Sequence, residues 1–325
     1  MFRTMSKRIL KHYRFGKLFG WINRHVRSRR KAIQQTRELY QAMGLVERGC
    51  CLCGNTEFTL VAEGDRYGFD LNKQFCNNCG LIQTYPSLPE EFHTEFYSRH
   101  YRPLYLKNKE VDYRPLVEEQ KIKGGDYLEY FLANGLEDVL SDISIIEIGC
   151  SSAGTINSLK SAVKSVQGCD LDIKAIEYAK KNFNLDVEVG SYPSHLPDGK
   201  KLFIMSHVLE HVYDPLATLK KIRSLMSEGD YLFIAVPGIN MVAEGYYKND
   251  LRRYFHIAHV TDFSASTLKA MAGLAGLEAL AADEEVMALF KSGEVDSNIA
   301  TADPDSVADN ILRIESTYRG FFPHL

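Results

Sequence analysis

Short apolar runs alternate with amphipathic stretches along the second half of the chain. The apolar runs predict strands at residues 143–148, 165–170, 186–189, 202–206 and 231–236. The amphipathic stretches predict helices at residues 155–164, 173–182, 215–226 and 267–275, followed by a hairpin of residues 277–281 and 286–290. Strands that alternate with helices of this length form a parallel sheet covered on both faces, so the predicted fold class is α/β.

The N-terminal half of the chain lacks this alternation. Residues 1–47 predict one or two basic helices, and residues 88–130 predict helices that Pro103 and Pro115 interrupt. The chain after Ser292 is polar and then weakly helical. No apolar stretch is long enough to cross a membrane as a helix, so we expect no membrane-spanning segment.

Composition and charge narrow the class of protein. Of the 325 residues, 45% are hydrophobic and 25% are charged, which is typical of a soluble globular enzyme. This balance excludes a disordered chain, a collagen and a coiled coil. The net charge of −3 hides an asymmetry, because residues 1–37 contain twelve Lys and Arg and no Asp or Glu. The rest of the chain is strongly acidic.

The basic segment 1–37 has three interpretations. Apolar side chains interspersed with Lys and Arg favour attachment to an anionic membrane surface. Contact with RNA and an Arg-rich targeting peptide are the alternatives. The acidic remainder would repel phosphates, so we do not expect a nucleic-acid partner. No secretory signal peptide is visible, and we expect a cytoplasmic protein that is peripheral at the inner membrane surface if this segment attaches there.

Five of the seven cysteines lie between residues 50 and 79. Cys50 and Cys53 form one C-x-x-C pair, Cys76 and Cys79 form another, and a glycine follows each pair. Two such turns offer four thiolates to one ion, which is the donor set of a closed structural Zn²⁺ site. Disulfides are the alternative, and a reducing compartment disfavours them. Cys51 is an alternative ligand to Cys50, although the matched spacing favours Cys50.

Two predicted strands end in residues suited to a charged cofactor. The first ends in E-I-G-C-S-S-A-G, residues 147–154, and the second ends at Asp170. Glycine there lets the backbone approach a ligand, and the second carboxylate can accept hydrogen bonds from the hydroxyls of a ribose. Glu147, two residues before Gly149, would repel the pyrophosphate of a dinucleotide. A carboxylate at that position favours an ammonium or sulfonium group, which indicates S-adenosylmethionine.

These motifs, together with H-V-L-E-H-V-Y-D-P at residues 207–215, resemble those of class I S-adenosylmethionine-dependent methyltransferases. The resemblance covers residues 140–290 and implies a Rossmann-like sheet of seven strands whose last strand is antiparallel. It implies cofactor contacts from Glu147, Gly149, Ser151, Gly154, Asp170, Ser191 and His207. Ser151 and Ala153 stand where many members have glycine.

Further motifs are similar to those of bacterial zinc-containing sugar methyltransferases. These motifs are the two C-x-x-C-G turns, Y-P-S-L-P-E-E-F at residues 85–92 and H-V-T-D-F-S at residues 259–264. In the C-methyltransferases of that group the late motif resembles H-E-H-x-x-Y-F-S, whereas Ile257 and Ala258 replace the first His and the Glu here. We therefore expect O-methylation of a small molecule or glycan, such as a sugar or surface-polysaccharide precursor. Sugar C-methylation, RNA methylation and a non-catalytic zinc-containing scaffold are the alternatives.

Methyl transfer requires orientation of the reactants and a base that takes the proton of the nucleophile. Histidine is the natural base near neutral pH. His259 and His207 are the catalytic candidates, with His256 as a third, and a structural or cofactor-contacting histidine is the alternative for each. Tyr97 and Tyr101 are candidates for the acceptor pocket, with packing in a linker helix as the alternative.

The patterns divide the chain into five segments. They are a basic leader (1–47), a zinc module (48–86), a helical linker that contributes to the acceptor pocket (87–139), a cofactor-binding domain (140–291) and a C-terminal tail (292–325). Glu210 and His211 lie at a predicted helix start, where we expect a structural role. Nothing in the sequence indicates an oligomeric state.

Overall fold

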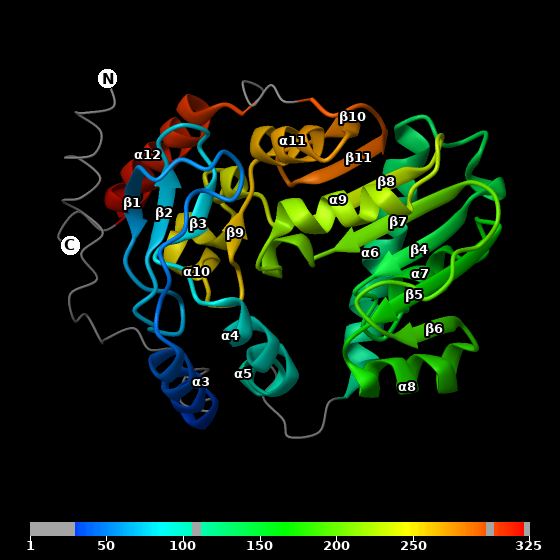
Figure 1. Ribbon diagram of the computed structural model, residues 1–325, viewed down its shortest axis with the longest axis horizontal. Coiled ribbons are helices and arrows are strands. Elements are labelled where there is room, and N and C mark those ends of the chain that lie inside the picture. Colours follow the sequence, from blue (N-terminus) through cyan, green and yellow to red (C-terminus); the bar gives the residue numbers. More distant parts are fainter. Residues whose placement is uncertain (1–29, 106–111, 297–301, 322–325) are drawn as a thin grey trace.

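Two sheets, one of seven strands and one of four, organise the computed structural model of the protein (Figure 1). The structure describes residues 30–105, 112–296 and 302–321. Most of the basic leader lies outside these residues, so its helices and its attachment to a membrane surface remain predictions. Among the described residues, no helix is both long enough and apolar enough to span a bilayer.

The larger sheet has the strand order β10-β11-β8-β7-β4-β5-β6. Its strands are β4 (Ser144–Ile148), β5 (Ser165–Asp170), β6 (Asp186–Val189), β7 (Lys201–Ser206), β8 (Tyr231–Ala235), β10 (Leu277–Ala282) and β11 (Met287–Ser292). Strands β4 to β8 pair in parallel, whereas β11 runs antiparallel to both of its neighbours. The predicted α/β class and the seven-stranded sheet with an antiparallel last strand are therefore confirmed.

Helices cover both faces of the larger sheet. On one face lie α6 (Tyr113–Ala133), α7 (Gly154–Leu159) and α8 (Ile173–Phe183). On the other face lie α9 (Pro215–Leu225) and α11 (Ala265–Leu274). Successive strand residues point to opposite faces, so Ile145 of β4 packs in the first core and Ile146 in the second. Burial on both faces explains why these strands are continuous apolar runs in the sequence.

The predicted boundaries of these elements agree with the observed ones within two residues, except at the first helix. That helix, α7, ends at Leu159 rather than at residue 164. The N–H of Ala162 donates to the carbonyl oxygen of Leu159 at 2.9 Å, which turns the chain there.

The two prolines expected to interrupt helices lie inside them. Pro115 is in the first turn of α6, three residues after the N-cap Asp112, where a missing N–H leaves no helical bond unmade. Pro103 lies in α5 (Tyr101–Tyr105), which continues from α4 (Glu90–Glu95) through the π-helical turn η2 (Phe96–His100). Proline has no N–H to donate to the carbonyl oxygen four residues earlier in a helix. The wider π-helical turn before Pro103 accommodates this missing bond, so the helix continues through the proline.

The smaller sheet contains the second cysteine motif at the end of β2 and has the order β1-β2-β3-β9. Strands β1 (Phe58–Ala62), β2 (Lys73–Cys76) and β3 (Ile82–Thr84) lie within residues 48–86. The fourth strand, β9 (Thr261–Asp262), comes from the other half of the chain and pairs antiparallel with β3 (Figure 1). Two residues carry no periodicity, so the sequence pattern did not predict β9.

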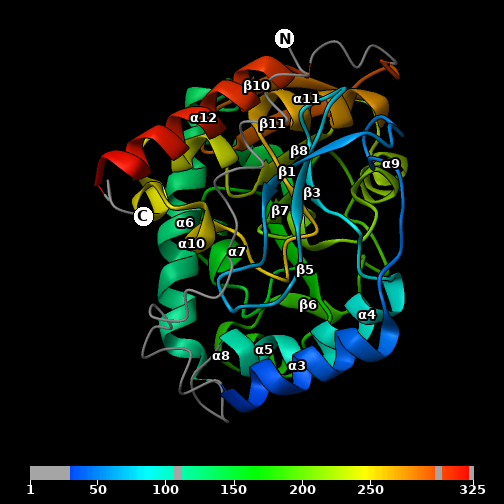
Figure 2. The ribbon, with the colours of Figure 1, turned by 90° about the vertical axis from the view of Figure 1, so that its left-hand side faces the viewer.

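Two further helices pack around the smaller sheet. α12 (Pro304–Phe321) covers it, with Val307 and Ile311 buried in one cluster with Val61 of β1. α3 (Arg30–Met43) lies beside α4 and α5 at the foot of the molecule (Figure 2). Short helical turns complete the fold: η3 (Leu140–Asp142), η4 (Leu209–His211), η5 (Ile239–Val242), η6 (Tyr246–Asn249) and α10 (Leu251–Tyr254).

Candidate active site

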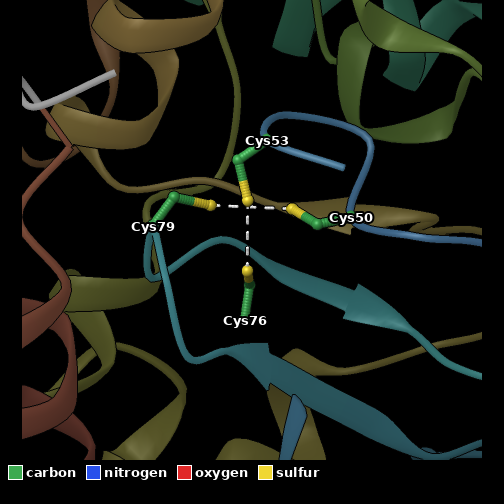
Figure 3. A group of neighbouring side chains, drawn as sticks. All are labelled: Cys50, Cys53, Cys76 and Cys79. Carbon is green, nitrogen blue, oxygen red and sulfur yellow. Dashed lines mark hydrogen bonds between the residues drawn. The ribbon is translucent and has the colours of Figure 1, made fainter. Parts of the chain in front are cut away.

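The sulfur atoms of four cysteines point toward one another between two turns of the smaller sheet (Figure 3). Those of Cys50 and Cys79 lie 3.6 Å apart, and those of Cys53 and Cys76 lie 3.4 Å apart. A disulfide would bring two sulfurs to about 2.05 Å. Four thiolates about 2.3 Å from one tetrahedral ion would lie about 3.8 Å from one another. The cluster therefore fits a metal ion, and its cysteines form no disulfide.

Two matching turns build this cluster. Gly54 donates its N–H to the carbonyl oxygen of Cys50 at 2.8 Å, and Gly80 donates to that of Cys76 at 2.9 Å. Both glycines have positive φ angles, +74° and +77°, which explains why a glycine follows each pair. Cys51 is not among the four cysteines that meet, whereas Cys50 is.

The carboxyl ends of β4 and β5 bring the two predicted cofactor carboxylates to one edge of the larger sheet. Glu147 is only 1% exposed, and its Oε2 accepts no hydrogen bond from any residue that the structure describes. Burial raises the pKa of Glu147 to about 8. A ligand cation beside this oxygen would restore the charged form, so the site fits the ammonium end of S-adenosylmethionine.

Asp170, at the end of β5, holds the loop that follows β4, residues 149–154, which we call the cofactor loop. Its Oδ2 accepts the N–H of Ser151 at 2.7 Å, and its Oδ1 accepts the N–H of Asp172 at 2.7 Å. Each carboxylate oxygen has a further lone pair, so both remain able to accept the hydroxyls of a ribose. The apolar side chain of Leu171, next in the chain, is 65% exposed at the same edge. Ser191 is also exposed, shortly after β6.

The backbone of the cofactor loop is left-handed at three positions. Gly149, Ser151 and Ala153 all have positive φ angles, of 77°, 50° and 59°. The left-handed conformation costs a residue with a side chain about 1–2 kcal/mol. A Cβ on Gly149 would lie 2.4 Å from Cγ2 of Val208, so the loop after β4 packs directly against the loop after β7.

Gly154 faces α6. A Cβ there would lie 2.7 Å from the carbonyl oxygen of Val117 and 2.7 Å from Cβ of Gln120. The Oε1 of Gln120 accepts the hydroxyl of Ser152 at 2.7 Å and the N–H of Gly154 at 3.1 Å, and its Nε2 donates to the carbonyl oxygen of Cys150. Gln120 of α6, about thirty residues earlier in the chain, therefore holds the cofactor loop in place. No sequence motif indicates this role.

The predicted linker also reaches the cofactor loop. Arg102 of α5 donates to Oγ of Ser151 at 3.2 Å and forms an ion pair with Asp172 at 2.8 Å. Arg102 was not among the predicted site residues, because it lies outside the motifs of the cofactor domain. Its contacts place α5 beside the loop that follows β4.

A buried glutamate meets three histidines after β7. The Oε1 of Glu210 lies 3.5 Å from Nδ1 of His207, 3.6 Å from Nε2 of His211 and 4.0 Å from Nε2 of His259. Neither carboxylate oxygen accepts a hydrogen bond from a described residue. Burial favours a higher pKa for Glu210, but the three imidazoles outweigh it and lower this pKa to about 2. Glu210 and His211, for which a structural role was expected, both belong to this cluster.

Residues of the smaller sheet contact the group formed by Glu210, His207, His211 and His259, which we call the histidine cluster. Nδ1 of His259 lies 3.3 Å from Oδ1 of Asp262, whose Oδ2 forms a buried ion pair with Lys73 of β2 at 2.7 Å. Lys73 also donates to the carbonyl oxygen of His259 at 2.6 Å. Burial lowers the pKa of His259 to about 4. The predicted zinc module thus contributes a side chain to the candidate active site.

Aromatic side chains border the cluster. The hydroxyl of Tyr97 donates to the carbonyl oxygen of Ala258 at 3.0 Å, and the rings of Tyr97 and Tyr101 lie 5.9 and 6.1 Å from that of His211. The ring of His256 lies 3.7 Å from that of His259. Both predicted acceptor tyrosines are half-buried and lie beside His211, which faces Glu210 together with His207 and His259.

The comparisons with known proteins agree with this fold. Residues 121–282 match a family model described as a methyltransferase domain. A curated relative, fumosorinone synthetase of Cordyceps fumosorosea, is 28% identical over 131 residues, which is 34% of this chain and 3% of that protein. The chain thus spans a small fraction of that relative.

Several solved structures are similar in part. One is an S-adenosylmethionine-dependent methyltransferase from Clostridium acetobutylicum, with 13% identity, a TM-score of 0.40 and coverage of 62% of this chain and 99% of that one. Another is magnesium protoporphyrin IX methyltransferase from Synechocystis with bound S-adenosylhomocysteine, with 14% identity, a TM-score of 0.41 and coverage of 62% and 96%.

The family match and the strand order define a class I methyltransferase domain. The chain therefore contains an S-adenosylmethionine-dependent methyltransferase domain, together with a four-cysteine cluster near its N-terminus that can bind a metal ion.

Proposed function

We propose that the protein methylates an oxygen of a small polyhydroxylated acceptor, such as a sugar or the precursor of a surface polysaccharide. The observation that carries this proposal is the cluster of imidazole and phenol groups after β7, next to the cofactor loop. Such groups donate to and accept from hydroxyls. Half-buried tyrosine rings offer apolar faces against which a sugar ring can pack.

The two candidate bases, His207 and His259, differ in how far their side chains are exposed. The side chain of His207 is 40% exposed, and its Nδ1 faces Glu210, so Nε2 is the nitrogen that can receive a proton from an acceptor. The side chain of His259 is 5% exposed, and its two ring nitrogens face Asp262 and Glu210. We therefore assign proton removal to His207 and a positioning role to His259.

The reaction follows from this arrangement. An acceptor oxygen attacks the methyl carbon of the sulfonium, and the electrons of the breaking carbon–sulfur bond go to the sulfur. S-adenosylhomocysteine leaves as a neutral thioether, and His207 takes the hydroxyl proton. The protein's main contribution is to hold the oxygen, the methyl carbon and the sulfur in line.

We propose that the four-cysteine cluster binds Zn²⁺ in a structural role. Four thiolates form a closed tetrahedral site with no position for a substrate. The burial of Cys50, Cys76 and Cys79 supports this role.

The test is a set of acceptors incubated with S-adenosylmethionine that carries an isotopically labelled methyl group. We expect label on an oxygen of a nucleotide sugar or a glycan precursor, located by mass spectrometry and NMR. Label on a carbon, or on RNA, would overturn the proposed acceptor class.

His207→Gln tests the assigned base. Loss of the base lowers turnover by about 10²–10⁴-fold while the dissociation constant of the cofactor stays unchanged. His195→Gln is the matched control, because His195 is an exposed histidine that pairs with Asp186 of β6. Wild-type turnover in the His207 variant would exclude it as the base.

A further inference from the structure

Both carboxylate oxygens of Glu210 are buried and accept no hydrogen bond from a described residue. The buried ammonium of Lys73 pairs with Asp262 rather than with Glu210. A buried carboxylate without a hydrogen bond or a fixed cation is costly, so this position calls for a positive charge.

Two histidines are oriented as metal ligands would be. Nδ1 of His259 faces the carboxylate of Asp262 at 3.3 Å. Nδ1 of His211 lies 2.9 Å from the carbonyl oxygen of Ala258, to which it donates. Metal-binding histidines usually engage their second nitrogen in this way, with a carboxylate or a carbonyl oxygen. In both side chains the remaining nitrogen, Nε2, faces Oε1 of Glu210.

The separations of the three donor atoms fit one ion. Nε2 of His211 and Nε2 of His259 lie 3.6 and 4.0 Å from Oε1 of Glu210, and all three donors lie within 4.8 Å of one another. Ligands about 2.1 Å from a tetrahedral ion would lie about 3.4 Å apart. The two separations from Oε1 of Glu210 exceed this value by about 0.2 and 0.6 Å, so the three side chains would have to move closer together to bind the ion.

We propose that Glu210, His211 and His259 bind a divalent first-row transition metal ion, separate from the four-cysteine site. Two imidazoles and one carboxylate are typical of zinc, manganese or ferrous iron, whereas magnesium prefers oxygen donors alone. Three protein ligands leave coordination positions open. The charge also balances better, because the ion would offset Glu210 while Lys73 and Asp262 neutralise each other.

The open positions give the ion a role toward the acceptor. An acceptor hydroxyl bound there would be oriented beside Tyr97 and Tyr101, and its pKa would fall, which eases its deprotonation by His207. This role rests on the proposed function, whereas binding of the ion does not.

Cobalt titration tests the site. The full chain, with zinc in the four-cysteine cluster, is titrated with Co²⁺ and followed by absorption and metal analysis. We expect one further equivalent of metal, with d–d bands and without the charge-transfer absorption of thiolate ligands. His211→Ala and Glu210→Gln should remove this equivalent while the cluster keeps its zinc, which reports that the variants are folded. His195→Ala is the control and should bind as the wild type does.

The outcomes separate the two proposals. If no further equivalent binds, or if His211→Ala binds it unchanged, the site is wrong and a proton on a histidine balances Glu210. If a methylated sugar forms equally fast without the second ion, the proposed function stands and the role of the ion toward the acceptor is wrong. If the ion binds but no hydroxyl acceptor is methylated, the site stands and the proposed function falls.

Discussion

Two buried glutamates in this protein are shifted in opposite directions. Burial raises the pKa of Glu147 to about 8, whereas three imidazoles overcome burial and lower that of Glu210 to about 2. The contrast lies in their neighbours, because three imidazoles lie near Oε1 of Glu210, whereas the negative charge of Asp170 adds to the effect of burial on the pKa of Glu147. Glu147 is therefore suited to a cation that arrives with the ligand, and Glu210 to one that stays in the protein.

The first prediction concerns the pH dependence of stability without cofactor. The folded protein retains the proton of Glu147 from the ordinary pKa of 4.5 up to about 8, whereas the unfolded chain loses it above 4.5. The free energy of unfolding should therefore fall as pH rises through this interval, by up to about 1.4 kcal/mol per pH unit from this group. Urea unfolding at several pH values measures the slope.

Glu147→Gln is the reference for this measurement, because it keeps the shape of the side chain and cannot ionise. The wild type should lose stability relative to the variant between about pH 5 and 8, and saturating S-adenosylmethionine should reduce the loss. Parallel pH curves for the two proteins would show that Glu147 is not protonated in the folded state.

The sequence predicted the site residues that belong to motifs but not those that reach it from elsewhere. The positions of Glu147, Asp170 and His207 follow from their place at strand ends, since the carboxyl ends of parallel strands share one edge. Lys73 and Gln120 lie far away in sequence and meet the site only through tertiary packing. No local pattern marks such side chains.

At the scale of elements, the contact between α6 and α7 explains two adjacent glycines. A Cβ on Gly124 would lie 2.0 Å from Oγ of Ser158 and 2.9 Å from the carbonyl oxygen of Thr155. A Cβ on Gly125 would meet nothing within 4 Å. Gly124 therefore lets α6 approach the helix that follows the cofactor loop, whereas Gly125 has no such role.

The second prediction uses this pair. Gly124→Ala should destabilise the protein by roughly 1–3 kcal/mol, because the helices must separate. Gly125→Ala should stabilise it by roughly 0.5–1 kcal/mol, because alanine favours an exposed helix position. Denaturant unfolding of both variants measures the difference, and equal effects would contradict the close contact.

Helices and strands with a clear pattern of apolar residues could be predicted from the sequence. Elements that form only through contact with another segment could not. The strands of the larger sheet are buried on both faces, which leaves an apolar run in the sequence. β9 exists only because β3 offers it hydrogen bonds, and the π-helical turn η2 depends on the proline that follows it. Interactions of this kind leave no periodic pattern.

At the scale of the whole molecule, strand β2 connects the cysteine cluster to the candidate active site. β2 carries Cys76 of the cluster at its end and Lys73 of the histidine cluster at its start. A change that loosens the two cysteine turns should therefore move Lys73 and, through Asp262, His259.

The third prediction compares two adjacent cysteines. Cys50→Ser should remove the metal ion from the four-cysteine cluster, lower the melting temperature and reduce turnover by up to roughly 100-fold through misplacement of the catalytic groups. Cys51→Ser should keep the ion, the stability and the turnover. Metal analysis, thermal unfolding and an activity assay test both variants. Full activity in a Cys50 variant that has lost its ion would disprove the link.

The strand shared between the two sheets also affects how the chain acquires its structure. β3 gains its second neighbour only when residues 261 and 262 arrive, long after the cysteine turns have been synthesised. Until then β3 presents an open edge, to which a strand of another molecule can add. Residues 48–86 expressed alone would keep that edge permanently, and such a fragment should associate with itself instead of remaining monomeric.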